Sequence, residues 1–140
     1  MMSTDGVILC VDDEETILSS LEMQLQDQFG SRFTVELAMG AADAWEILES
    51  YEQNQLDVLV IITDWQMPAI KGDEFLIEAH RRFPRVVKIM LSGQATSAAR
   101  KNAVENGGLF RFIDKPWQPE ELRRAIEDGL IETLAPGELQ

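Results

Sequence analysis

The sequence predicts an α/β fold: a doubly wound, five-stranded parallel sheet with five helices. Five short apolar segments alternate with five longer segments whose apolar residues are spaced three and four apart, as on one side of a helix. The short segments are mostly apolar, and two of them, 7–11 and 58–62, are apolar without interruption, which is typical of parallel strands that are covered on both faces. The chain has 140 residues, of which 45% are hydrophobic, and this suffices for one domain with its own core.

The predicted strands carry mostly β-branched and other apolar side chains. They cover residues 7–11, 33–38, 58–63, 86–91 and 109–113. The third is the most strand-like, because β-branched residues dominate it.

A predicted helix follows each strand. The first covers residues 14–29, and Gly30 is expected to end it in a left-handed conformation. The other four are expected near residues 41–51, 75–83, 95–106 and 119–130. Pro84 would stop the third helix, and Pro119 is favourable at the first position of the fifth.

Composition narrows the possible functions. The net charge of −13, with a pI near 4.3, argues against direct nucleic-acid binding, which needs a basic surface. No apolar run reaches the length of a membrane span, no secretory signal is visible, and Cys10 is the only cysteine. We therefore expect a cytoplasmic protein with no membrane association. We expect an N-terminal extension over residues 1–6, one domain over 7–134, and a tail or the start of a linker over 135–140.

Polar side chains follow four of the five predicted strands, at the edge where ligands bind in parallel sheets. Asp12 and Asp13 follow the first strand, and Asp64 follows the third. Carboxylates this close together repel, which raises the pKa of at least one unless a divalent cation such as Mg²⁺ is bound. Ser92, Gly93 and Gln94 follow the fourth strand, and Lys115 follows the fifth. A hydroxyl, a backbone N–H and an ammonium at this edge could bind the oxygens of an aspartyl phosphate.

Simpler interpretations exist for each of these residues. Asp12 and Asp13 could cap the first helix, and Ser92 could be a turn or cap residue. Lys115 could be a solvated surface lysine, and Phe112 could be an ordinary core residue. His80, next to two arginines, is predicted to be a surface residue.

Four groups of residues, each after its own strand, resemble the receiver domain of two-component response regulators. They are the pair Asp12-Asp13, Asp64 followed by Met67-Pro68 and Gly72, Ser92 with Gly93, and Lys115-Pro116. The resemblance covers nearly the whole chain and implies the flavodoxin-like receiver fold.

The resemblance also implies roles for individual residues. Asp64 would be the phosphoacceptor, charged by a histidine kinase. The Mg²⁺ ligands would be Asp13, Asp64, the backbone carbonyl of Gln66 and, through water, Asp12. Ser92, Gly93, Lys115 and Phe112 would form the phosphate-binding and switch residues, with Lys115-Pro116 joined by a cis bond. Gln66 and Gln94 would flank the approach of a hydrolytic water and tune the lifetime of the phosphate.

The function implied is a phosphorylation-dependent switch rather than an enzyme, apart from assistance to its own phosphorylation and dephosphorylation. The surface formed by the fourth helix, fifth strand and fifth helix would control a downstream protein, an attached output domain or a homodimer. A Mg²⁺-dependent phosphatase of related fold is disfavoured, because such enzymes want a second acid where this chain has Gln66. A non-phosphorylated binding module is disfavoured by the retention of Asp13, Asp64, Ser92 and Lys115.

Overall fold

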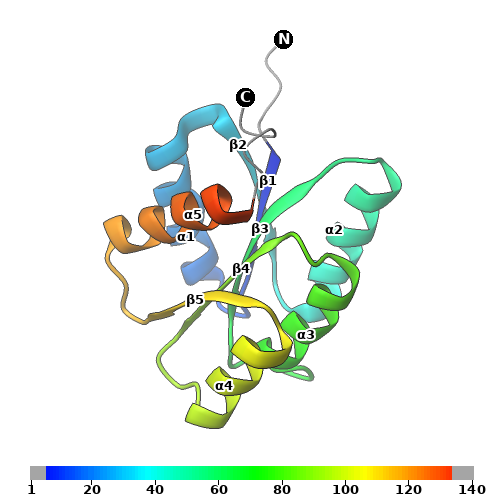
Figure 1. Ribbon diagram of the computed structural model, residues 1–140. Coiled ribbons are helices and arrows are strands. Elements are labelled where there is room, and N and C mark those ends of the chain that lie inside the picture. Colours follow the sequence, from blue (N-terminus) through cyan, green and yellow to red (C-terminus); the bar gives the residue numbers. More distant parts are fainter. Residues whose placement is uncertain (1–5, 134–140) are drawn as a thin grey trace.

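Five parallel strands form one sheet in the order β2-β1-β3-β4-β5 in the computed structural model of the protein, which describes residues 6–133 (Figure 1). The strands are β1 (Gly6–Val11), β2 (Phe33–Ala38), β3 (Val58–Asp64), β4 (Val87–Ser92) and β5 (Leu109–Asp114). The helices are α1 (Glu15–Phe29), α2 (Ala41–Gln53), α3 (Gly72–Arg82), α4 (Ser97–Asn106) and α5 (Pro119–Thr133), and a 3-10 turn, η1 (Gly30–Arg32), follows α1. The predicted fold class is confirmed.

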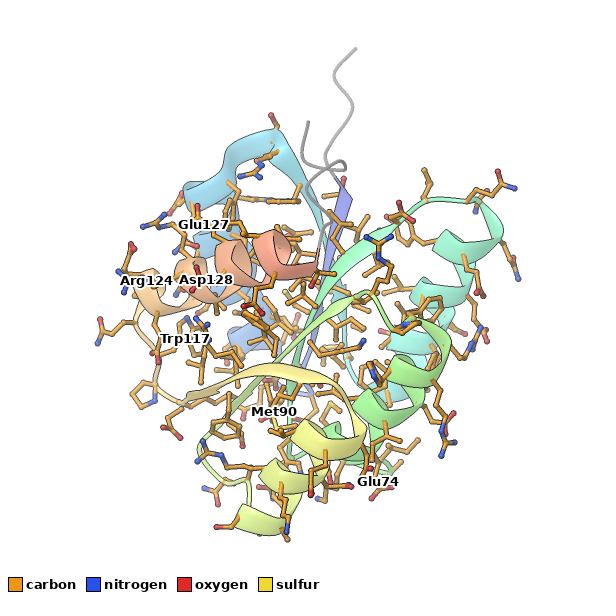
Figure 2. The ribbon with its side chains drawn as sticks, viewed as in Figure 1. Glu74, Met90, Trp117, Arg124, Glu127 and Asp128 are labelled. Carbon is orange, nitrogen blue, oxygen red and sulfur yellow. The ribbon has the colours of Figure 1, made fainter. Side chains whose placement is uncertain are left out.

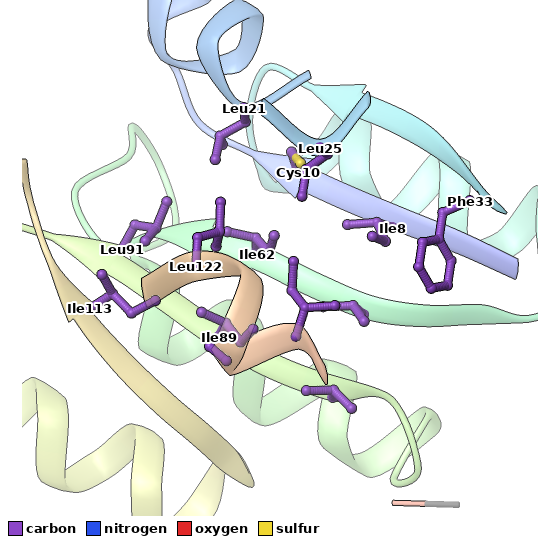
Figure 3. Close-up of a cluster of buried hydrophobic side chains, with 14 of the residues drawn as sticks. Ile8, Cys10, Leu21, Leu25, Phe33, Ile62, Ile89, Leu91, Ile113 and Leu122 are labelled. Atoms are coloured by element: carbon purple, nitrogen blue, oxygen red, sulfur yellow. The ribbon is translucent and has the colours of Figure 1, made fainter. Parts of the chain in front are cut away.

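Two layers of helices cover the sheet, with α1 and α5 on one face and α2, α3 and α4 on the other (Figure 1). Successive strand residues point to opposite faces. Ile8 and Cys10 therefore pack under α1 and α5, and Leu9 and Val11 pack under α2 and α3. Figure 3 shows the first of these two cores. Both faces of β1 and β3 are buried, which explains their unbroken apolar runs.

The observed elements differ from the predicted ones mainly at their ends. β1 begins at Gly6, one residue before the predicted strand. β3, β4 and β5 each continue into the polar residue that follows their apolar run. α4 begins at Ser97, because the hydroxyl of Thr96 accepts the N–H of Ala99 at 3.0 Å and caps the helix there. The predicted tail, 135–140, lies outside the described residues.

The outer surface of the helices is charged. On α5, Arg124 is exposed and Asp128 forms an ion pair with Arg111 of β5 at 3.1 Å, whereas Met90 lies at the centre of the fold (Figure 2). Within residues 6–133, no helix is long and apolar enough to cross a lipid bilayer.

Lys88 is a fully buried lysine in the middle of β4. Its Nζ lies 3.0 Å from His80 Nδ1 and donates to the carbonyl of Phe83 at 2.9 Å, at the carboxyl end of α3. The prediction that His80 is only a surface residue was wrong, because its half-buried ring faces this lysine. Gly108 makes room for the ring, since a Cβ at Gly108 would lie 2.4 Å from His80 Nδ1.

Burial lowers the pKa of Lys88 from 10.5 to about 8. Between these two values the unfolded chain binds more protons than the folded one, so the stability contributed by this group rises with pH across that window. In Lys88→Met, which removes the charge and keeps most of the volume, this pH dependence should disappear. The difference between the free energies of unfolding of wild type and variant should therefore change with pH. It should shift in favour of the wild type by up to about 3 kcal/mol between pH 8 and 10.5.

Urea unfolding at several pH values measures this difference. Lys101→Met, which alters an exposed lysine of α4, is the matched control and should leave the pH dependence unchanged. A constant difference between wild type and Lys88→Met across the window would show that Lys88 titrates like a solvated lysine.

Candidate functional site

The carboxyl ends of β1, β3, β4 and β5 meet around an open hollow of about 650 Å³. Seven of the residues singled out in the sequence line it: Asp13, Asp64, Gln66, Ser92, Gly93, Gln94 and Lys115. Asp12 is buried beside the hollow. Phe112 does not line it. Glu14, Ile17 and Trp117 also line the hollow, although the sequence analysis gave them no role in the site.

Trp117 ties the loop after β5 to α1. Its indole N–H donates to Oε1 of Gln24 at 2.8 Å. Its position two residues after Lys115 was the available sign that it lies at the site.

Three carboxylates form the acidic part of the site. Asp12, Asp13 and Asp64 each place an oxygen within 4.8 Å of the others. Asp12 and Asp64 are buried, whereas Asp13 is exposed and faces the hollow. Oxygen donors of this kind and number fit a hard divalent cation, which needs only part of its ligands from the protein.

Lys115 is the cation that this structure supplies to the carboxylates. Its Nζ lies 3.1 Å from Asp12 Oδ2 and 3.3 Å from Asp64 Oδ1. Burial lowers the pKa of Lys115, but the hydrogen bond to Asp12 and the charge of Asp64 outweigh this effect and raise it. Lys115 therefore stays charged, and its largely buried, paired side chain is not that of a solvated surface lysine.

The carboxyl group of Asp64 is under opposing influences. Burial raises its pKa, the charge of Lys115 lowers it and the charge of Asp12 raises it, and the net effect is a raised pKa. Its Oδ1 accepts the backbone N–H of Trp65 at 2.8 Å in addition to facing Lys115. One oxygen of the carboxyl group is thus held by the protein.

Two of the simpler interpretations hold in part. Asp12 Oδ1 accepts the backbone N–H of Glu14 at 2.8 Å, so one oxygen shapes the turn into α1 while the other contacts Lys115. The hydroxyl oxygen of Ser92 accepts the backbone N–H of Gln94 at 3.1 Å, as a turn residue does, and still lines the hollow. Turn formation and a place in the site are compatible for both residues.

The loops that carry the site depend on two special backbone positions. The Lys115–Pro116 bond is cis, as the resemblance implied. At Gly72, an added Cβ would lie 2.2 Å from the carbonyl oxygen of Asp64. Only glycine allows α3 to begin against the end of β3, where the N–H of Gly72 donates to the carbonyl of Trp65 at 2.8 Å.

Phe112 lies outside the hollow, on β5 beside α4. Its half-buried ring is covered by Arg100 of α4, whose guanidinium carbon is 3.9 Å from the ring centroid. Such a cation–π contact is worth about 0.5–1 kcal/mol at an exposed site. The ring therefore packs on one side against the core under α2 and α3, whereas the weak contact with Arg100 covers its outer side.

Because the pKa of Asp64 is raised, its ionisation costs stability in metal-free protein. The folded protein binds more protons than the unfolded chain between the ordinary pKa of 3.8 and the raised pKa of Asp64. The free energy of unfolding therefore falls as pH rises through this range, and it stays lowered at neutral pH. Asp64→Asn keeps an oxygen for the N–H of Trp65 and removes the charge, so it should unfold at higher urea concentration than wild type at pH 7 in a chelating buffer.

Asp13→Asn is the control for this substitution, because it removes an exposed charge of the same cluster and should have the smaller effect. A metal-free Asp64→Asn variant less stable than wild type would contradict the assignment of Asp64 as an electrostatically strained group.

Comparison with known proteins agrees with this geometry. Residues 8–127 match the response regulator receiver domain family. The hydrogenase transcriptional regulatory protein HoxA of Cupriavidus necator is 32% identical over 131 residues, which are 91% of this chain but only 25% of that regulator. A CheY homolog, a chemotaxis protein of Campylobacter jejuni, is 30% identical over 125 residues, which are 88% of this chain and 91% of the relative.

A solved structure agrees as well. The signal receiver domain of an HD domain-containing protein from Pseudomonas fluorescens superposes with a TM-score of 0.82 at 26% identity, over 95% of this chain and 92% of the other. Sequence, fold and the arrangement of the strand ends therefore agree, and the chain belongs to the response regulator receiver family of two-component signalling.

Proposed function

We propose that Asp64 accepts a phosphoryl group from a histidine kinase and that the domain thereby switches a signalling surface. The observation that carries the proposal is the position of Lys115, whose Nζ lies within 3.3 Å of oxygens of both Asp12 and Asp64 beside a solvent-open hollow. A carboxylate next to a cation in a hollow lined by a hydroxyl and backbone amides is suited to receive and hold a phosphoryl group.

Mg²⁺ fits the donor set of the site. Asp13, Asp64 and the backbone carbonyl of Gln66 would hold it directly, with Asp12 supporting it through water. When bound, it would neutralise the carboxylates and the charge on the phosphoryl oxygens.

The residues of the chain position the reacting groups. Asp64 Oδ1 is held by the N–H of Trp65 and by Lys115, whereas Oδ2 makes no hydrogen bond to any residue in 6–133. Oδ2 would attack phosphorus as the bond from phosphorus to the histidine nitrogen of the donor breaks. Lys115 and the amides after β4 would then hold the oxygens of the product. Gln66 and Gln94, both exposed at the hollow, would set how readily water reaches it.

The output would pass through α4, β5 and α5. Phosphorylation would draw the hydroxyl of Ser92 toward the phosphate and free Phe112 to leave its contact with Arg100. We propose a downstream protein, an attached output domain or a second copy of the chain as the recipient, since the chain spans only 25% of the hydrogenase regulators that it matches. We further propose a cytoplasmic location and no catalysis on other substrates. The phosphatase alternative is not favoured, because Gln66 occupies the place of its second acid.

Acetyl phosphate with Mg²⁺ should add the mass of one phosphoryl group to the wild-type protein. Asp64→Asn should abolish the gain, because the amide is a poor nucleophile for phosphorus, and Asp114→Asn, which alters an exposed acid next to Lys115, should retain it. Intact-mass spectrometry measures all three.

Tryptophan fluorescence gives a second measurement on the same proteins, because Trp65 and Trp117 adjoin the site. It should change when Mg²⁺ is added and again with beryllofluoride. Absence of both the mass gain and the fluorescence changes in wild type, or a mass gain in Asp64→Asn, would refute the proposal.

A further inference from the structure

Asp73 is a buried carboxyl group that belongs neither to the acidic site nor to the surface. It lies in the first turn of α3 and is 8% exposed. Its Oδ1 accepts the indole N–H of Trp65 at 2.8 Å, and its Oδ2 accepts the side-chain N–H of Asn102 at 2.9 Å. A first-turn acid needs no such partners, as the exposed Glu74 beside it illustrates. Asp73 therefore does something other than complement the helix dipole.

One end of this arrangement is attached to the acceptor. The backbone N–H of Trp65 donates to Asp64 Oδ1 at 2.8 Å, and its carbonyl accepts from Gly72 at 2.8 Å. The side chain of Trp65 packs against the core under α2 and α3. The position of this tryptophan thus depends directly on what the carboxyl group of Asp64 can accept.

The other end is attached to α4. Asn102 lies on α4, and its side-chain oxygen accepts from Asn106, one turn further along, at 2.8 Å. The buried residues of α4 are only Ala99 and Ala103. Two small side chains bury little apolar area, so they hold the helix weakly. The hydrogen bond from Asn102 to Asp73 is therefore a large part of what sets the position of α4 against α3.

We propose that Trp65, Asp73 and Asn102 form a hydrogen-bonded connection that carries the state of the Asp64 carboxyl group to α4, in parallel with Ser92 and Phe112. Asp73 is the central residue of this connection, because it positions both the indole of Trp65 and the side chain of Asn102. This inference rests on the proposed phosphorylation of Asp64.

The physical cause of the coupling is the change in the acceptor for the N–H of Trp65. An ionised carboxylate makes a charge-assisted hydrogen bond, about twice as strong as a neutral one. In the acyl phosphate formed through Oδ2, the same N–H faces Oδ1 as a neutral acyl oxygen. The weaker bond lets Trp65 move, its indole N–H moves relative to Asp73, and the contact from Asp73 to Asn102 adjusts the position of α4.

The test is the response of α4 to Mg²⁺ and beryllofluoride, followed by the backbone amide signals of ¹⁵N-labelled protein. Trp65→Phe keeps a ring and the backbone N–H but removes the indole donor. Asn102→Ala breaks the other link, and Asp73→Asn cannot accept both donors while its own amide N–H faces one of them. In each variant the ligand-induced shifts of residues 99–106 should fall about 2-fold relative to wild type, because the parallel route through Ser92 and Phe112 remains.

Two controls match these variants. Trp45→Phe alters a tryptophan that packs on Phe75 from α2, and Lys101→Ala alters an exposed neighbour on α4. Both should leave the α4 response at its wild-type size. If the links are in series, Trp65→Phe combined with Asn102→Ala should lower the response no further than either change alone.

The signals of Ser92 and Lys115 separate the possible failures. If they shift with the ligand in Trp65→Phe and Asn102→Ala while α4 responds as in wild type, the connection is refuted and the proposed function stands. If they do not shift in the wild-type protein, the proposed function fails and the connection fails with it. An additive loss in the double variant would refute the series arrangement.

Discussion

The ammonium group of Lys115 lies between Asp12 and Asp64, and the geometry of the whole edge depends on this contact. The two carboxylates end neighbouring strands, β1 and β3, whereas the lysine follows β5 and must reach past the end of β4. The strand that it passes ends in the small residues Ser92 and Gly93, and the carbonyl of Ser92 accepts the N–H of Lys115 at 3.3 Å. This backbone hydrogen bond fixes Lys115 beside the end of β4, from where its side chain reaches the two acids.

The contact between Lys115 and the two carboxylates reduces the free-energy cost of burying these charges but does not remove it. Burial disfavours the charged form of both partners, and the attraction between them restores the charge on Lys115 while Asp64 keeps a raised pKa. An acidic site that keeps this cost would be stabilised by a divalent cation, which would offset the charges of the carboxylates. Stability given up in this way for binding is common at functional sites.

Much of the fold could be predicted because β1 and β3 are buried on both faces and so carry uninterrupted apolar runs, and the other strands are mostly apolar. The strand ends were less predictable, since Asp64, Ser92 and Asp114 pair in the ladder although they are polar. Lys88 shows a different limit. Only the folded structure shows what surrounds its ammonium group. The carbonyl of Phe83 at the end of α3 accepts a hydrogen bond from it, and the ring of His80 lies beside it.

Some features of the site could likewise be predicted from the sequence, and others could not. Its residues could be predicted from their places after the strands, because a parallel sheet brings its carboxyl ends to one edge. The connection through Asp73 could not, because Asp73 and Glu74 both suit the first turn of a helix and nothing local distinguishes them. What distinguishes them is the packing of α4 against α3, which brings Asn102 within 2.9 Å of Asp73. Contacts between elements distant in sequence carry no local signal.

The most direct measurement is a crystal structure of the protein with Mg²⁺ and beryllofluoride. The account predicts beryllium bonded to the carboxyl group of Asp64, Mg²⁺ in contact with Asp13 and Asp64, and Lys115 turned from Asp12 toward a fluorine. Beryllofluoride on another carboxylate, or none bound at a saturating concentration with Lys115 still between Asp12 and Asp64, would contradict it.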